Sequence, residues 1–157
     1  MKKIISFDLD DTLFVSPDLC KTEKRLRFPF SLIYSDRLRL GTIELFHQLQ
    51  SMGIETYIYT TSFRSEKYIR RLFRHYGIRL GEIINGQRHQ KEVQGDRKEP
   101  LPSKYPSKYR INLHIDDDKS VMDNGKCYGF KVFLIEPKNQ ENWVNDILEA
   151  ASKIREI

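Results

Sequence analysis

The chain has 157 residues, of which 39% are hydrophobic and 31% are charged. This balance is typical of one globular domain with a substantial core, and it excludes an intrinsically disordered chain. No apolar run is long enough to cross a membrane, and the formal net charge of +5 is compatible with a polyanionic partner without selecting one.

The first residues, Met1-Lys2-Lys3, are followed by too short an apolar run for a secretory signal. The two cysteines, Cys20 and Cys127, form no metal-binding pattern. We therefore expect reduced thiols and a cytoplasmic protein with no membrane contact.

Lys3-Ile4-Ile5 reads as a short buried strand, and three carboxylates follow it at Asp8, Asp10 and Asp11. Carboxylates cluster at the edge of a core when a cation joins them, most often Mg²⁺ with its preference for oxygen ligands. Strand alternation predicts that Asp8 and Asp10 face one point, and Thr12 adds a hydroxyl at the same spacing. The alternative is an Asp-rich turn at the end of a strand.

Residues 14–40 show no regular period. Their basic residues alternate with aromatic and aliphatic ones: Lys21, Lys24, Arg25, Arg27, Phe28, Phe30, Leu32, Ile33, Tyr34, Arg37 and Arg39. Such a mixture can grip single-stranded nucleic acid. We prefer a loop that folds over the sheet edge with its aromatic rings inward, because no nucleic-acid-binding motif accompanies it.

A helix is predicted over 41–52, ended by Gly53, and a strand over 54–59. That strand ends in Thr60-Thr61-Ser62, where a hydroxyl could donate to a phosphate oxygen. The alternative is ordinary helix capping by Ser62 or Ser65.

An amphipathic helix is predicted over 65–76 with a basic outer face that we expect to be solvated. Arg64, just before it, would lie beside the phosphate site and contact substrate. A short third strand follows at 82–84. Residues 86–103 have almost no apolar content, which predicts an exposed, mobile loop.

Lys104 and Lys108 precede the next strand, and a lysine near the carboxylates would neutralise them; otherwise both are surface lysines. Ile111-Asn112-Leu113-His114-Ile115 then runs into Asp116-Asp117-Asp118, a second acid cluster at a strand end. Asp118 is expected to begin a short helix through Met122, and His114 to be structural.

The last predicted elements are a strand over 129–135, closed by Pro137, and a helix over 141–157. Alternating strands and helices predict an α/β protein with a doubly wound parallel sheet. Ligands bind such sheets at the carboxyl ends of the strands, where the predicted acids and hydroxyls fall.

Phe7-Asp8-Leu9-Asp10-Asp11-Thr12-Leu13 resembles the first motif of the haloacid dehalogenase-like (HAD) superfamily. The strand that ends at Thr60, the lysine at Lys104 (or Lys108) and the strand that ends in Asp116-Asp117 resemble its second, third and fourth motifs. The resemblance covers nearly the whole chain, and it implies a Rossmann-like core of five main strands in the order five-four-one-two-three.

The resemblance also implies roles. Asp8 is the nucleophile, Asp10 the general acid/base, and Thr60 and Lys104 stabilise the phosphoryl group, with Thr61 as an assistant or substitute for Thr60. Mg²⁺ is bound by Asp8, Asp116 and Asp10, the last through its backbone carbonyl, and Asp117 is either a further ligand or a group that supports the ligands. Thr12, Thr61 and Arg64 are the expected substrate contacts.

The intervals where this family places a cap domain are filled mostly by predicted core elements, so we expect a single capless domain over 1–157 with an open site. The expected function is a Mg²⁺-dependent phosphatase that uses an aspartyl-phosphate intermediate on a phosphorylated small molecule or macromolecule. A phosphotransferase differs only in the acceptor. The alternative is a catalytically weak module that binds nucleic acid or a phosphorylated partner.

Overall fold

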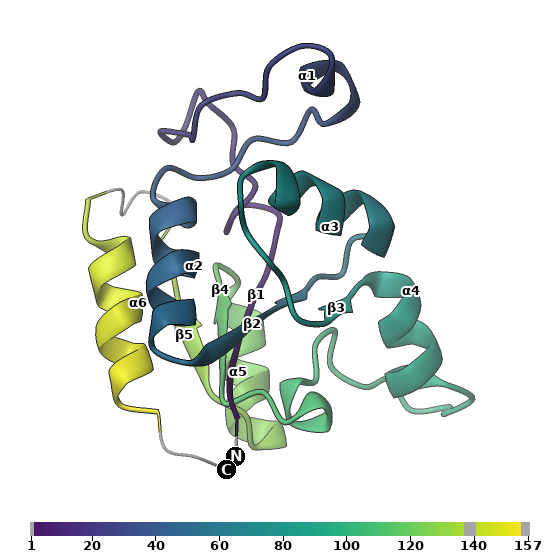
Figure 1. The fold of residues 1–157 in the computed structure, drawn as a ribbon. Coiled ribbons are helices and arrows are strands. Elements are labelled where there is room, and N and C mark those ends of the chain that lie inside the picture. Colours follow the sequence, from purple (N-terminus) through teal and green to yellow (C-terminus); the bar gives the residue numbers. More distant parts are fainter. Residues whose placement is uncertain (1, 137–140, 155–157) are drawn as a thin grey trace.

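The computed structural model describes residues 2–136 and 141–154. Its five parallel strands form one sheet with the spatial order β3-β2-β1-β4-β5 (Figure 1). The strands are β1 (Lys3–Phe7), β2 (Ile54–Tyr59), β3 (Ile83–Ile84), β4 (Leu113–Asp116) and β5 (Val132–Leu134). The sheet confirms the predicted single α/β domain, its five strands and their order.

Helices connect the strands, as parallel pairing requires. They are α1 (Phe30–Ile33), α2 (Thr42–Ser51), α3 (Glu66–His75), α4 (Gly86–His89), the π-helical turn η1 (Gln90–Gln94), the 3₁₀ turn η2 (Pro106–Tyr109), α5 (Lys119–Tyr128) and α6 (Trp143–Ser152). No helix among residues 2–136 and 141–154 has both the length and the apolar character of a membrane span.

The helix ends follow local chemistry. Gly53 takes a φ of 72° just after α2, and the Ser65 hydroxyl caps α3 by accepting from the Tyr68 N–H at 3.2 Å. Asp118 caps α5 as expected, but α5 runs to Tyr128 instead of Met122 and ends where Gly129 adopts a φ of 71°. Pro137 and the end of the predicted last helix lie outside the described residues.

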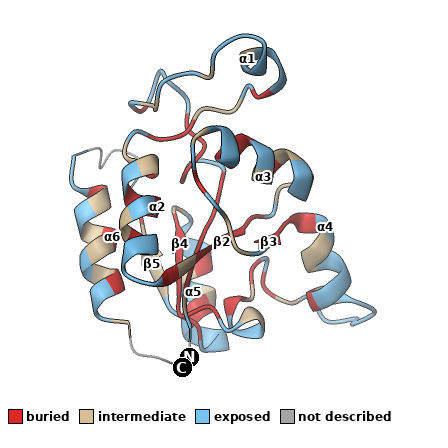
Figure 2. Ribbon diagram, in the orientation of Figure 1, coloured by how far each residue is buried: buried red, intermediate tan, exposed pale blue. Residues whose placement is uncertain are grey.

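The sheet has one strongly apolar face. Ile5 and Phe7 of β1 point into the larger core, which includes side chains of α2, α3 and α6. The rings of Phe7 and Phe46 lie 4.8 Å apart there, and Trp143 of α6 is 2% exposed. Figure 2 shows these strands as buried segments between partly exposed helices.

The opposite face is smaller and more polar. It holds a second cluster around Ile4, Tyr57 and Tyr59, which Tyr109 of η2 covers. Ser6 and His114 are completely buried on it. Alternation along β1 and β4 also brings Asp8 and Asp116 to this face, so the polar face leads directly to the expected site.

Residues 14–40 contain only α1 as a regular helix, in agreement with the irregular insertion that the sequence predicts. The prediction that the aromatic residues of this insertion pack inward is wrong for some of them. Tyr34 is buried, but Phe28 is 78% exposed and Phe30 41%. Figure 1 shows α1 projecting beyond the layers that surround the sheet, and none of its four residues is buried.

The prediction of a loop over 86–103 is wrong for the first half of this segment, because α4 and η1 occupy residues 86–94. The Asn85 side chain accepts from the Arg88 N–H at 2.9 Å and so caps α4. Gly86 is needed because a Cβ there would lie 2.3 Å from the Thr61 carbonyl oxygen. Val93 is 3% exposed, and this one apolar side chain anchors a segment whose composition is otherwise polar.

Candidate active site

Lys104 lies between two buried aspartates. Its Nζ donates to Asp8 Oδ1 at 2.7 Å and to Asp116 Oδ2 at 2.5 Å. All three side chains are at least nine-tenths buried, so the two carboxylates share one cation inside the protein. Asp8 follows the end of β1 and Asp116 ends β4, which are neighbouring strands.

Asp117 completes an acidic group with Asp8 and Asp116. One carboxylate oxygen of each lies within 4.8 Å of the others. The Thr12 hydroxyl donates to Asp117 Oδ1 at 3.0 Å and is fully buried. This contact orients the Asp117 carboxylate, and the expected substrate contact of Thr12 stays a prediction.

The pKa values of Asp8, Asp116 and Lys104 are shifted in different directions from their ordinary values. Burial raises the pKa of Asp8 to about 7, against the opposing charge of Lys104. Burial acts the same way on Asp116, but a hydrogen bond from His114 and the charge of Lys104 outweigh it and lower its pKa to about 2. The pKa of Lys104 is raised, because both carboxylates overcome the burial that would lower it.

His114 supports Asp116 from the polar face of the sheet. Its Nε2 lies 2.9 Å from Asp116 Oδ2, and its Nδ1 lies 2.7 Å from Ser6 Oγ. Burial lowers the pKa of His114. The expectation of a structural role fits this position, and the contact adds that His114 fixes the orientation of a site carboxylate.

The segment that carries Lys104 is tied to β2. The Tyr59 hydroxyl oxygen accepts from the Tyr105 N–H at 2.8 Å and lies 2.7 Å from His89 Nδ1. Lys108, the alternative lysine, is exposed and donates to the carbonyl oxygen of Glu92. Of the two lysines, Lys104 is the one that lies at the carboxylates.

Thr60 follows β2 and is 1% exposed. Its Oγ1 accepts from the Ser62 N–H at 3.1 Å, which leaves the hydroxyl proton for a phosphate oxygen. Thr61 is exposed and lines a cavity of about 260 Å³ with residues of the next segment. The other lining residues are Phe63, Gly86, His89, Gln90, Gln94, Leu101 and Ser103.

Asp10 lies away from this acidic group. β1 ends at Phe7, so strand alternation reaches Asp8 but does not continue to Asp10, and the prediction that the two carboxylates face one point is wrong. Asp10 is half exposed and pairs with Arg64 at 3.0 Å. Arg64 also pairs with Asp36 at 3.0 Å, and Tyr68 donates to that same carboxylate at 2.9 Å.

In the structure Arg64 contacts Asp10 and the insertion, and its expected contact with substrate stays a prediction. Its guanidinium stacks over Phe14 at 5.2 Å, which holds it further in place. Arg39, 2% exposed, donates to the carbonyl oxygens of Thr12 at 2.8 Å and Asp11 at 3.1 Å. The insertion therefore positions the loop that carries Asp10.

The acidic group suits a hard divalent cation. Three carboxylates offer oxygen ligands within a small space, and Lys104 already supplies positive charge to two of them. Asp8, Asp116 and Asp117 fit the expected Mg²⁺ site, and the contribution of the Asp10 carbonyl stays a prediction.

Sequence reasoning missed four residues that contact the site residues or the segment carrying Lys104: Ser6, Asp36, Tyr59 and His89. The Asn-Gly sequence after β3 offered the cap of α4 as a signal, and that helix carries His89. Nothing local indicated Asp36, which reaches Arg64 only through the folding of the insertion.

No protein-family model and no curated protein sequence matches the chain. Among solved structures, it is similar to a HAD-superfamily hydrolase of subfamily IA from Geobacter sulfurreducens PCA, with 13% identity, a TM-score of 0.59 and coverage of 96% of this chain and 100% of that one. The chain has the HAD fold. A hydrolase from Streptococcus pneumoniae TIGR4 (14% identity, TM-score 0.59, coverage 95% and 100%) shares it.

A third similar structure, a predicted phosphoglycolate phosphatase from Haemophilus somnus 129PT, is 18% identical with a TM-score of 0.56 and coverage of 95% and 97%. At these identities the likeness concerns the fold. The HAD fold places the ends of β1, β2 and β4 together, and in this chain those ends carry Asp8, Thr60 and Asp116.

Proposed function

We propose that this chain is a phosphatase that hydrolyses phosphomonoesters through an aspartyl-phosphate at Asp8. The observation that carries the proposal is the buried Lys104, which bridges Asp8 and Asp116 at the carboxyl ends of two adjacent parallel strands. A purely structural role would not need three carboxylates and a lysine at a ligand-binding edge.

Asp8 is the nucleophile. A carboxylate oxygen forms a bond to phosphorus while the bond from phosphorus to the ester oxygen breaks. The Lys104 ammonium and the Thr60 hydroxyl donate to the non-bridging oxygens and stabilise the charge of the transition state. Lys104 also favours the ionised form of Asp8, against the burial that raises its pKa.

Asp10 is the general acid and then the general base. It protonates the leaving ester oxygen and later removes a proton from the water that attacks the aspartyl-phosphate, which releases inorganic phosphate and restores Asp8. Arg64 holds this carboxylate, so proton transfer needs Asp10 to turn toward the substrate. Mg²⁺, held by Asp8, Asp116 and Asp117, would supply positive charge against the phosphate dianion.

The test is hydrolysis of an aryl phosphate by the full chain, with Mg²⁺ and with a chelator, for wild type and Asp8→Asn. We expect turnover that requires both the metal and Asp8, and circular dichroism should show that the variant folds. Turnover retained by Asp8→Asn would contradict the nucleophile assignment. Release of free phosphate, compared with transfer to an added alcohol, separates a phosphatase from a phosphotransferase.

A further inference from the structure

Positive charge is concentrated along α3 and the segment after it. Residues 64–80 contain six basic side chains and a single acid, Glu66. Glu66 pairs with Arg70 at 2.7 Å. Lys67, Arg71, Arg74 and Arg79 are exposed, so most of this charge faces solvent.

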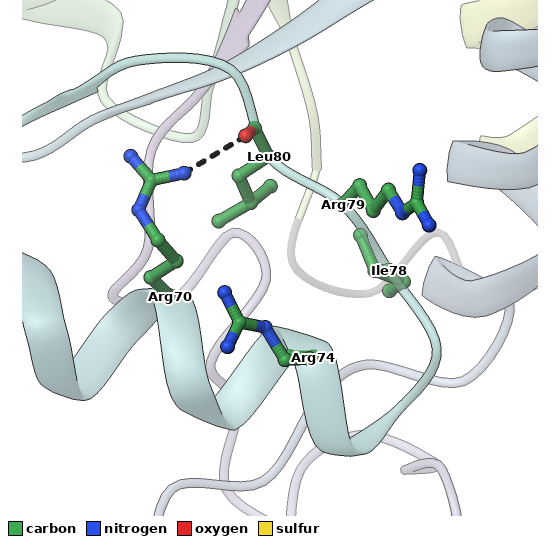
Figure 3. A pocket seen from close by; sticks show the side chains of 5 residues that line it. All are labelled: Arg70, Arg74, Ile78, Arg79 and Leu80. Carbon is green, nitrogen blue, oxygen red and sulfur yellow. Dashed lines mark hydrogen bonds between the residues drawn. The ribbon is translucent and has the colours of Figure 1, made fainter.

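A pocket of about 580 Å³ lies at the C-terminal half of α3. Figure 3 shows the side chains that line it, Arg70 and Arg74 from α3 and Ile78, Arg79 and Leu80 from the following segment. Arg70 is fixed, since it donates to the carbonyl oxygens of Leu80 at 2.9 Å and Gly81 at 3.0 Å. Arg74 and Arg79 can meet an anion that enters from solvent.

The insertion brings aromatic rings to this same end of α3. The ring of Phe30 lies 4.2 Å from that of His75, the residue after Arg74. The Tyr76 hydroxyl donates to the Lys24 carbonyl oxygen at 3.0 Å. Phe28, two residues before Phe30, leaves 78% of its surface in solvent.

The insertion adds cations around these rings. Lys24, Arg25 and Arg27 are exposed. In residues 2–136 and 141–154, no acidic side chain forms an ion pair with Lys24, Arg27 or Arg74. Unneutralised cations next to exposed rings favour a partner with both negative charge and flat, stackable groups.

We propose that this surface binds single-stranded nucleic acid. We call it the basic aromatic surface, and it consists of Lys24, Arg27, Phe28, Phe30, Arg74 and Arg79. The cations would hold backbone phosphates, with one phosphate in the arginine-lined pocket, and the exposed rings would stack on bases without selecting a sequence. An acidic protein segment would match the charge but would leave the ring faces without a stacking partner.

The surface is distinct from the candidate active site. α3 begins beside that site, where Arg64 contacts Asp10, and ends at the basic aromatic surface with His75. Binding therefore does not rest on the proposed phosphatase chemistry, and either proposal can fail alone.

The first test measures how much the cations of the surface contribute to binding. The anisotropy of a labelled oligo-dT is followed with the full chain between 50 and 200 mM salt, for wild type, Arg74→Ala/Arg79→Ala and the control Arg97→Ala. Each lost phosphate contact should make the slope of log K against log salt concentration shallower by about 0.7. The slope should therefore become shallower by about 1.4 in the double variant and stay unchanged in the control. No binding by wild type, or equal slopes, would overturn the proposal.

The second test measures stacking. Phe28→Leu keeps an apolar side chain without a flat ring, whereas Phe28→Tyr keeps the ring. Because stacking is worth about 1–3 kcal/mol per base, affinity should fall about 5- to 150-fold for Phe28→Leu and stay near wild type for Phe28→Tyr. An equal loss in both, or competition by polyglutamate as strong as by unlabelled oligo-dT, would overturn the proposal.

Discussion

On one face of the sheet β1 presents Ile5 and Phe7 to α2, α3 and α6. On the other face Ser6 of β1 lies against His114, and Asp8, directly after β1, contacts Lys104. The first face is held by apolar contact, which is non-directional and tolerates small shifts. The second depends on hydrogen bonds and ion pairs between buried groups, each of which has a defined partner.

The apolar face of the sheet contributes mainly to the stability of the domain, whereas the polar face also carries the groups of the proposed chemistry. Removing an apolar side chain leaves a cavity, but the remaining contacts persist. Removing one buried ion leaves its partners unpaired, at a cost comparable to that cavity, and also removes a group that would act on phosphate. Substitutions on the two faces should therefore separate folding from activity.

The largest effect is expected for Lys104→Met. It leaves Asp8 and Asp116 without their shared cation, so the metal-free protein should lose about 3–5 kcal/mol of unfolding free energy. Hydrolysis should fall at least 10²- to 10³-fold, the range for one lost oxyanion donor. Denaturation and aryl phosphate turnover measure both, with Lys108→Met as the control; equal losses in the two variants would show that Lys104 has no special role.

On the apolar face, Leu49→Ala should lower the unfolding free energy by about 2–5 kcal/mol, because Leu49 is fully buried in the larger core. Activity per folded molecule should stay within about twofold of wild type. Urea denaturation and turnover at a temperature where both proteins are folded provide the comparison. A loss of activity as large as that of Lys104→Met would remove the distinction between the faces.

The pKa of Asp8 predicts a pH effect on the metal-free protein. The unfolded carboxyl ionises near pH 3.8 and the folded one near 7, so stability should fall as pH rises between these values and stay low above 7. The upper limit is about 4 kcal/mol, at about 1.4 kcal/mol per pKa unit. The lowered pKa of Asp116 has the opposite sign and acts only below about pH 4.

Chemical denaturation at pH 5 and pH 8 with a chelator tests this effect. Asp8→Asn should be more stable than wild type at pH 8 and similar to it at pH 5, and Mg²⁺ should stabilise wild type most at pH 8. The same pH dependence in wild type and Asp8→Asn would assign it to another group.

A smaller effect is expected for His114→Leu, which keeps a buried side chain of moderate size but removes the contacts to Asp116 and Ser6. Lost support of a metal-binding carboxylate typically weakens metal affinity about 10- to 100-fold. Titration of the Mg²⁺ dependence of turnover measures this, and a maximal rate that recovers at high Mg²⁺ identifies a positioning role. Unchanged Mg²⁺ dependence would leave His114 as a packing residue alone.

The parallel α/β architecture and the position of the acidic and hydroxyl groups at the strand ends follow from the sequence alone. Periodicity reports which strands are apolar, and a parallel sheet brings their carboxyl ends to one edge, so Asp8, Thr60 and Asp116 were predictable together. Resemblance to the HAD motifs pointed to Lys104 before Lys108.

The contact partners of these groups become known only from the folded structure. Arg64 meets Asp36 across 28 residues, and Lys104 meets Asp8 across 96, through contacts that no local pattern encodes. The polar composition of residues 86–94 predicted a loop, but the buried Val93 and the Asn85 cap are enough to form helix there. The prediction that aromatic residues pack inward was wrong for Phe28, which is exposed. Local propensity is a weak prior, and the contacts available after folding override it.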